Sequence, residues 1–162
     1  MNKAVFLDRD GVINRKGGSY YIFRKEDFIF NEGIPEALRK LRDKGYLLIV
    51  ITNQGGISKS VHTEEDTQKL HEYMTSALGM EGITITAVYY CPHHPDNKTC
   101  ECRKPGHLLF ERAIAEHDIE REKSVMIGDS DVDIEAAARA GIRGIKITTN
   151  SNLLDHAGIN SL

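Results

Sequence analysis

The sequence has no tryptophan, only four prolines and no long hydrophobic run, and each of these shortages narrows the class of protein. So few prolines argue against a fibrous or disordered chain. No stretch approaches the roughly 20 apolar residues of a transmembrane helix, and the apolar stretch 4–7 is too short for the core of a signal peptide. We therefore expect a cytoplasmic protein that does not enter a membrane.

An excess of charge of either sign is also absent. Lys and Arg total 21 against 24 Asp and Glu, a net charge of -3, which offers no broad attraction for nucleic acid or anionic lipid. A chain of 162 residues suits one hydrophobic core, so we expect a single domain over residues 1–162. Because no coiled-coil seam or long apolar surface stretch is apparent, we expect a monomer.

Apolar segments rich in β-branched residues alternate along the chain with amphipathic segments. The expected strands are residues 3–7, 46–51, 83–90, 124–127 and 144–147, and the expected helices are residues 35–44, 64–78, 107–117 and 131–140. This alternation predicts a Rossmann-like, doubly wound α/β fold whose sheet is mostly parallel, with helices on both faces. Ligands of such sheets bind at the carboxyl ends of the strands.

Two carboxylates follow the first expected strand. Asp8 and Asp10 are two residues apart, so in extended chain both side chains point to one side. Such a pair either binds a cation or shifts the pKa of one partner, and both outcomes suit a carboxylate nucleophile beside a general acid/base. A solvated acidic turn is the plainer alternative.

Three further strand ends carry complementary chemistry. The turn 52–54 offers a hydroxyl and two amides, and Lys104 offers a positive charge that would neutralise a phosphoryl group. Asp129 follows the fourth strand and would bind a hard cation such as Mg²⁺ together with Asp8. Ordinary turns and helix capping explain each signal taken alone, but their order at successive strand ends indicates one site.

Together the motifs at residues 8–11, 52, 104 and 128–133 resemble those of the haloacid-dehalogenase-like (HAD-like) phosphohydrolase superfamily. The segments 6–11, 52–54 and 91–105 look like its histidinol-phosphate and heptose-bisphosphate phosphatase branch. Because the chain has no room for the cap domain that some members carry, the resemblance implies a capless fold with an open site.

The resemblance also implies roles for single residues. Asp8 would attack phosphorus to form an aspartyl-phosphate, and Asp10 would protonate the leaving group and then activate water. Thr52 and Lys104 would bind the phosphoryl oxygens.

A catalytic Mg²⁺ is implied as well. Its ligands would be the Asp8 carboxylate, the backbone carbonyl of Asp10, and Asp129. Asp133 would orient this shell through hydrogen bonds, although direct binding and helix capping stay open.

The three cysteines lie close together in a short loop, residues 91–102. Cys91, His93, Cys100 and Cys102 have a spacing that suits a tetrahedral Zn²⁺ site. Four protein ligands leave no open position, so this zinc would be structural and would support the segment before Lys104. His94 is an alternative ligand that extended chain would point away, and three reduced cysteines without metal are the plainer reading.

Substrate contacts are expected from the segment 14–33, in particular Gly18, Ser19, Tyr20 and Tyr21, because it forms a long loop beside the open site. Asn53, Gln54 and Arg103 complete the expected set. Arg103 would suit a second phosphate, which favours D-glycero-D-manno-heptose 1,7-bisphosphate as substrate.

The main alternative is histidinol phosphate, a phosphorylated amino alcohol. A phosphotransferase such as a mutase is less favoured because water reaches an open site easily, and an inactive zinc-stabilised binding module is the remotest reading.

Overall fold

The computed structural model describes residues 1–17 and 20–162 and confirms the doubly wound α/β fold. Gly18 and Ser19, two of the expected substrate contacts, lie outside the described residues. Within the described part, five parallel strands form one sheet in the order β3-β2-β1-β4-β5. The strands are β1 (Lys3–Leu7), β2 (Tyr46–Asn53), β3 (Ala87–Cys91), β4 (Val125–Gly128) and β5 (Arg143–Lys146).

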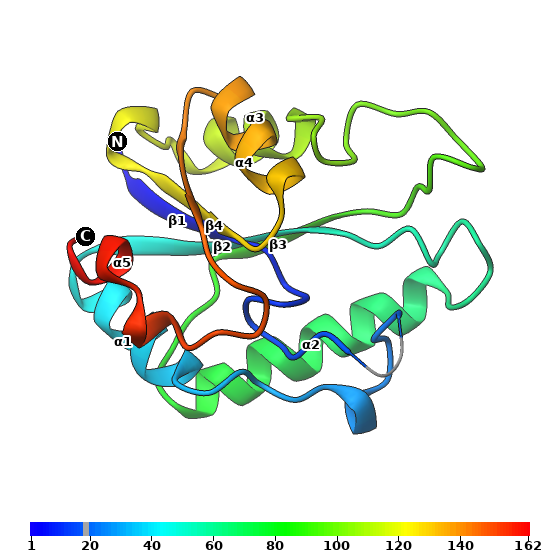
Figure 1. The fold of residues 1–162 in the computed structure, drawn as a ribbon, viewed down its shortest axis with the longest axis horizontal. Coiled ribbons are helices and arrows are strands. Elements are labelled where there is room, and N and C mark those ends of the chain that lie inside the picture. The colour runs from blue at the N-terminus through cyan, green and yellow to red at the C-terminus, as the bar shows by residue number, and fades with distance from the viewer. Residues whose placement is uncertain (18–19) are drawn as a thin grey trace.

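Helices cover both faces of this sheet. They are α1 (Ile34–Asp43), α2 (Glu64–Met80), α3 (Leu108–His117), α4 (Asp131–Arg139) and α5 (Ala157–Asn160), with short 3₁₀ helices at Lys25–Asp27, Arg121–Lys123 and Leu153–Asp155. Figure 1 shows α1, α2 and α5 on one face and α3 and α4 on the other. Among the described residues, none of the helices combines the length and apolar character that crossing a membrane requires.

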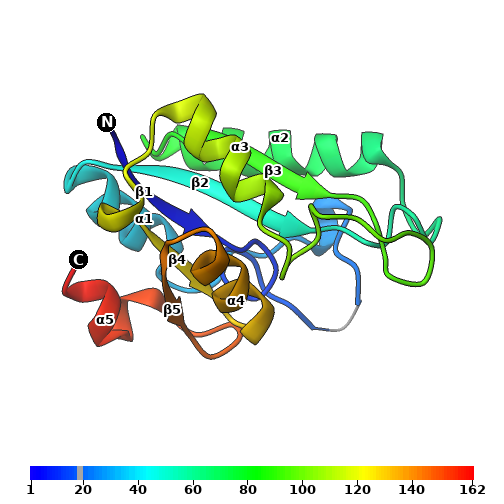
Figure 2. The same ribbon diagram turned by 90° about the horizontal axis from the view of Figure 1, so that it is seen from above.

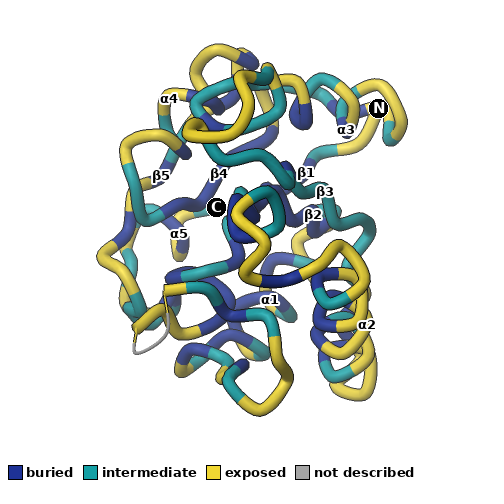
Figure 3. The backbone as a smooth tube through the Cα atoms, turned by 90° about the vertical axis from the view of Figure 1, so that its right-hand side faces the viewer, coloured by how far each residue is buried: buried dark blue, intermediate teal, exposed yellow. Residues whose placement is uncertain are grey.

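Each face of the sheet has its own hydrophobic core. On β1, Val5 and Leu7 join the core under α1 and α2, whereas Ala4 and Phe6 join the core under α3 and α4. All four are fully buried, which explains why a parallel strand covered on both sides reads as a continuous apolar run. Figure 3 shows mostly buried chain in the central strands β1 and β4 and exposed chain on the outer sides of the helices.

The third strand starts later than its apolar sequence predicts. Ile83 is buried, but its N–H donates to the carbonyl of Leu78 at 3.0 Å and thereby closes the end of α2. Gly82 supplies the left-handed turn, with φ of 75°. Residues 83–86 connect α2 to the strand, with Ile83 buried and Thr84 exposed, and the pairing of β3 with β2 begins at Ala87.

The strand order places a topological switch point between β1 and β4. From β1 the chain moves outward to β2 and β3, and it then returns to the other side of β1 to form β4. Figure 2 shows β1 between β2 and β4. Helices therefore leave β1 and β4 in opposite directions, which opens a crevice at the carboxyl ends of these two strands. Asp8 and Asp129 directly follow them.

Candidate active site

A buried lysine lies between two carboxylates at this crevice. The Nζ atom of Lys104 is 3.0 Å from Oδ1 of Asp8 and 2.7 Å from Oδ1 of Asp133. It also donates to the backbone carbonyl of Ile51 at 2.8 Å. Burial by itself lowers the pKa of Lys104, but the charges of Asp8 and Asp133 raise it above its ordinary value. Lys104 is therefore charged and forms an ion pair with each of the two carboxylates.

The backbone of Lys104 is held by Asn53 at the end of β2. The amide oxygen of Asn53 accepts from the Lys104 N–H at 2.9 Å, and its amide nitrogen donates to the Lys104 carbonyl at 3.2 Å. Asn53 also lines the crevice, as expected of a substrate contact. Its two polar atoms nevertheless position Lys104, a role that the sequence pattern did not indicate.

Asp8 experiences an excess of negative charge. Burial raises its pKa, Lys104 opposes this effect, and the charges of Asp133 and Asp10 raise it again, which brings the pKa to about 7. An additional positive charge beside Asp8 would favour its ionised form. The electrostatics of the protein alone thus create a place for a cation.

Asp10 is held by three donors from different parts of the chain. Arg9 donates to both carboxylate oxygens, at 2.9 and 3.2 Å, and the side-chain amides of Asn14 and Gln54 each donate at 3.0 Å. Burial acts to raise the pKa of Asp10, but the Arg9 charge and these hydrogen bonds outweigh it and lower the pKa below its ordinary value. Asp10 is therefore ionised and fixed in direction when no ligand is bound.

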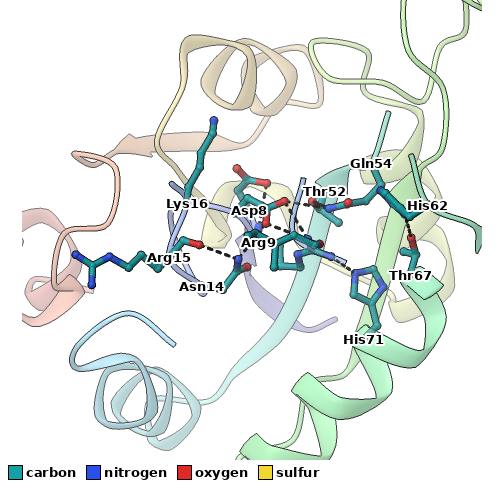
Figure 4. Close-up of polar contacts among 12 residues, drawn as sticks. Asp8, Arg9, Asn14, Arg15, Lys16, Thr52, Gln54, His62, Thr67 and His71 are labelled. Atoms are coloured by element: carbon teal, nitrogen blue, oxygen red, sulfur yellow. Dashed lines mark hydrogen bonds and ion pairs between the residues drawn. The ribbon is translucent and has the colours of Figure 1, made fainter. Parts of the chain in front are cut away.

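Thr52 lies just beneath the crevice. Its side chain is buried, and its hydroxyl accepts a hydrogen bond at 2.9 Å from Gln54 Nε2, which also donates to Asp10. Figure 4 shows Thr52 and Gln54 side by side. Since the hydroxyl acts as acceptor here, its own proton is left to donate.

Three carboxylates fit a hard divalent cation. Oxygens of Asp8, Asp129 and Asp133 all lie within 4.8 Å of one another, and Mg²⁺ prefers such oxygen ligands. Gly11 allows this approach, because a Cβ atom at its position would lie 2.2 Å from Oδ2 of Asp129. Its φ of 88° is also in the left-handed region that suits glycine.

The crevice encloses a cavity of about 170 Å³. The expected residues that line it are Asp8, Asp10, Tyr20, Tyr21, Asn53, Gln54, Arg103, Lys104, Asp129 and Asp133. Lys16, which lies in the expected segment 14–33 but was not singled out, also lines the cavity, as do Gly55, His94, Ser130 and Val132. The sequence indicates His94 only as an alternative zinc ligand. In the structure its side chain points away from the cysteines and lines the crevice.

The cysteine loop forms a compact cluster beside the crevice. Donor atoms of Cys91, His93, Cys100 and Cys102 lie within 4.8 Å of one another, and Sγ of Cys91 is 2.9 Å from Sγ of Cys102 and 3.5 Å from Sγ of Cys100. These separations exceed the roughly 2.05 Å of a disulfide bond. The donor set of three sulfurs and one imidazole is the type that zinc prefers in structural sites.

The cluster is also joined to the site. Cys91 ends β3 and pairs with Asn53 of β2, whereas Cys102 directly precedes Arg103. Arg103 in turn donates from NH1 to the backbone carbonyl of His93 at 3.1 Å. Any ion held here would connect the end of β3 to the segment that carries Lys104.

The fold and the four strand-end motifs define a hydrolase of the HAD-like class. A family model described as HAD-hydrolase-like matches residues 101–158. The chain is 42% identical over 147 residues to the D-glycero-β-D-manno-heptose-1,7-bisphosphate 7-phosphatase of Haemophilus ducreyi, covering 87% of this chain and 80% of that protein. It is also 42% identical to the enzyme of the same name from Helicobacter pylori strain J99, over 94% of this chain and 86% of the relative.

A solved structure supports the same family assignment. D,D-heptose 1,7-bisphosphate phosphatase from B. bronchiseptica, complexed with magnesium and phosphate, superposes with a TM-score of 0.84 and 29% identity, over 93% of this chain and 82% of that one. The chain therefore belongs to the HAD-like phosphatase family that includes the heptose-1,7-bisphosphate 7-phosphatases.

Proposed function

We propose that this protein is a magnesium-dependent phosphatase that removes the 7-phosphate of D-glycero-D-manno-heptose 1,7-bisphosphate, with Asp8 as covalent nucleophile. The observation that carries the proposal is the pairing of Asp8 with the buried ammonium of Lys104, 3.0 Å away, at the switch point of the sheet. The named activity of relatives that are 42% identical supports the same substrate.

In the first step a carboxylate oxygen of Asp8 attacks phosphorus and the bond from phosphorus to the sugar oxygen breaks. Asp10 gives its proton to the departing alkoxide, which yields an aspartyl-phosphate and the sugar hydroxyl. The Asp10 carboxyl must be protonated at this point, and the negative charge of a bound phosphate ester raises its pKa in the required direction. Lys104 and the Thr52 hydroxyl donate to the phosphoryl oxygens.

In the second step Asp10, now ionised, takes a proton from water, and the resulting hydroxide attacks phosphorus. The bond between phosphorus and the Asp8 oxygen breaks, and inorganic phosphate leaves. The low pKa of Asp10 in the free protein suits this base role, because the carboxylate is ionised at neutral pH.

The proposed Mg²⁺ ligands are the carboxylates of Asp8 and Asp129 and the backbone carbonyl of Asp10. When bound, Mg²⁺ would favour ionised Asp8 and offset negative charge on the phosphoryl oxygens. We assign Asp133 an indirect role, because its Oδ1 pairs with Lys104 and its Oδ2 accepts from the Ser130 hydroxyl at 3.0 Å.

Zinc is the second proposed metal, held by Cys91, His93, Cys100 and Cys102. Its role is structural, since the cluster ties the end of β3 to the segment before Lys104. Burial raises the pKa of Cys91 and of Cys102. Burial also acts to raise the pKa of Cys100, but hydrogen bonds from the Arg103 backbone and from the neighbouring donors lower it to about 6. The thiolate, which is the form that binds metal, is therefore favoured at Cys100.

A bisphosphorylated substrate suits the cations that line the cavity. Lys104 lies beside Asp8, whereas Arg103 and Lys16 offer positive charge elsewhere on the lining. NH1 of Arg103 already donates to His93, which leaves other N–H groups of the guanidinium for the second phosphate. Tyr20 and Tyr21 would contact the sugar. Histidinol phosphate has no second phosphate that would use Arg103.

We also propose that the protein is monomeric and cytoplasmic. Size-exclusion chromatography with light scattering tests the first of these points, and a mass of one chain, 18.2 kDa, is expected.

The decisive experiment measures phosphate release with Mg²⁺ from both anomers of heptose 1,7-bisphosphate and from histidinol phosphate. Asp8→Asn is compared with Asp43→Asn, a matched change of a surface aspartate. We expect a strong preference for the bisphosphate, loss of activity in Asp8→Asn and full activity in the control. Preference for histidinol phosphate would refute the substrate, and an active Asp8→Asn would refute the nucleophile.

A further inference from the structure

A charged residue with no assigned role lies between the two catalytic carboxylates. Arg9 is fully buried and is the largest such side chain in the described part of the chain. Burying a guanidinium is unfavourable unless its charge and its donors are satisfied. Its partners therefore indicate why it is there.

Arg9 is held through its two terminal nitrogens, whereas its buried Nε has no hydrogen-bond partner among the described residues. Its NH2 atom donates to both oxygens of Asp10, at 2.9 and 3.2 Å, and to the backbone carbonyl of Ile22 at 2.6 Å. On the far side, NH1 lies 3.1 Å from Nε2 of His71. Figure 4 shows His71 reaching from α2 toward Arg9.

His71 is suited to accept a hydrogen bond from Arg9. Burial, together with the Arg9 charge, lowers the pKa of His71 to about 3, so the imidazole is neutral at physiological pH and Nε2 can act as acceptor. The ring of His71 packs against that of Tyr90, with centroids 5.8 Å apart. The acceptor therefore has a fixed place between α2 and β3.

We propose that Arg9, held in place by His71, is a positioning residue that directs the Asp10 carboxyl toward the leaving oxygen of the substrate. The inference rests on the proposed role of Asp10 as general acid. A general acid must lie within hydrogen-bonding distance of the atom it protonates. The NH2 atom of Arg9 contacts both oxygens of Asp10 and, together with the amides of Asn14 and Gln54, restricts rotation of the carboxyl. Ile22 and His71 in turn restrict rotation of the guanidinium.

Substitution of His71 separates this role from general stability. His71→Leu removes the acceptor of NH1 and leaves a second buried N–H of Arg9 unpaired beside that of Nε. We expect the guanidinium to turn toward another acceptor and to shift Asp10 with it. His71→Gln keeps an amide oxygen that can accept the same hydrogen bond. Thr67→Val is the control, because Thr67 is buried on α2 one turn earlier and contacts His62 rather than Arg9.

The test uses two substrates that differ in their need for a general acid. The heptose bisphosphate releases a sugar alkoxide and requires protonation, whereas p-nitrophenyl phosphate releases a stable phenolate and does not. The measured quantity is kcat/KM, which reports the phosphoryl-transfer step without the later hydrolysis.

General acid catalysis contributes about 10²–10⁴-fold. Misdirection of Asp10 in His71→Leu should remove part of this contribution. We expect kcat/KM to fall about 10-fold on the heptose substrate and to change little on p-nitrophenyl phosphate. His71→Gln and Thr67→Val should resemble the wild type on both.

Equal losses on both substrates, or no loss in His71→Leu, would overturn the proposal. If His71→Leu does not fold, His71→Asn replaces it, because its shorter side chain also fails to reach Arg9. Failure of the proposed function is distinguishable, since the wild type itself would then release no phosphate from the heptose substrate, whatever residue 71 is.

Discussion

Replacement of Lys104 by methionine tests the electrostatics of the site without reference to any substrate. The side chain is 2% exposed and its ammonium pairs with Asp8 and with Asp133, whose side chain is fully buried. Methionine has a similar length but no charge, so Lys104→Met leaves two carboxylates facing each other. Removing one partner of a buried ion pair typically costs about 3–5 kcal/mol, which for a domain of this size is roughly 6–20 °C in Tm.

The measurement is urea unfolding followed by circular dichroism, in buffer without added magnesium so that no other cation compensates the carboxylates. Adding Asp133→Asn to Lys104→Met should restore about 1–3 kcal/mol, since residues in one ion-pair network are coupled. The control, Lys69→Met, removes an exposed lysine from α2 and should not change stability measurably. A small effect of Lys104→Met, or strictly additive effects in the double variant, would refute the reasoning.

Three other predictions concern pH, substrate and metal. The pKa of His71 is about 3 in the folded protein against 6.5 as its ordinary value, so between these values the unfolded chain binds a proton that the folded protein lacks, and stability falls as pH falls. His71→Gln should therefore flatten the pH dependence of unfolding between pH 6.5 and 4 by up to ~1.4 kcal/mol per pH unit; equal slopes would contradict the assignment. Arg103→Gln should raise KM for the bisphosphate about 10–100-fold with a smaller effect on kcat, because it removes a charge-assisted hydrogen bond worth about 1.5–3 kcal/mol, while KM for a monophosphate stays nearly constant. Purified protein should contain one zinc ion per chain by elemental analysis, and Cys102→Ser should lose both the zinc and thermal stability; a wild type free of zinc would exclude the site.

Much of the fold could be predicted because local patterns determine it. The expected strand 3–7 matches β1, and the expected helix 64–78 lies within α2. Parallel pairing follows from the alternation of elements, so the edge of the sheet that carries Asp8 and Asp129 was predictable too. The predicted start of β3 was wrong: Ile83 donates to the end of the preceding helix, and pairing with β2 begins at Ala87.

The residues that sequence reasoning missed are those whose roles depend on distant partners. Arg9, beside two acidic residues, looks like a solvated side chain, yet it is buried by contacts with Ile22 and with His71, which is 62 positions away. Asn53 looked like a substrate contact, and only the structure shows that it holds the backbone of Lys104 across 51 positions. No local pattern records such contacts.

The double hydrogen bond between Asn53 and the backbone of Lys104 also separates the position of the lysine from the length of the cysteine loop. Because these two hydrogen bonds hold the lysine directly against the end of β2, its position does not depend on the number of residues between His94 and Thr99. Residues 95–99, which lie in this loop, are exposed. A peptide tag or a reporter inserted in this segment would leave the two hydrogen bonds between Asn53 and Lys104 in place.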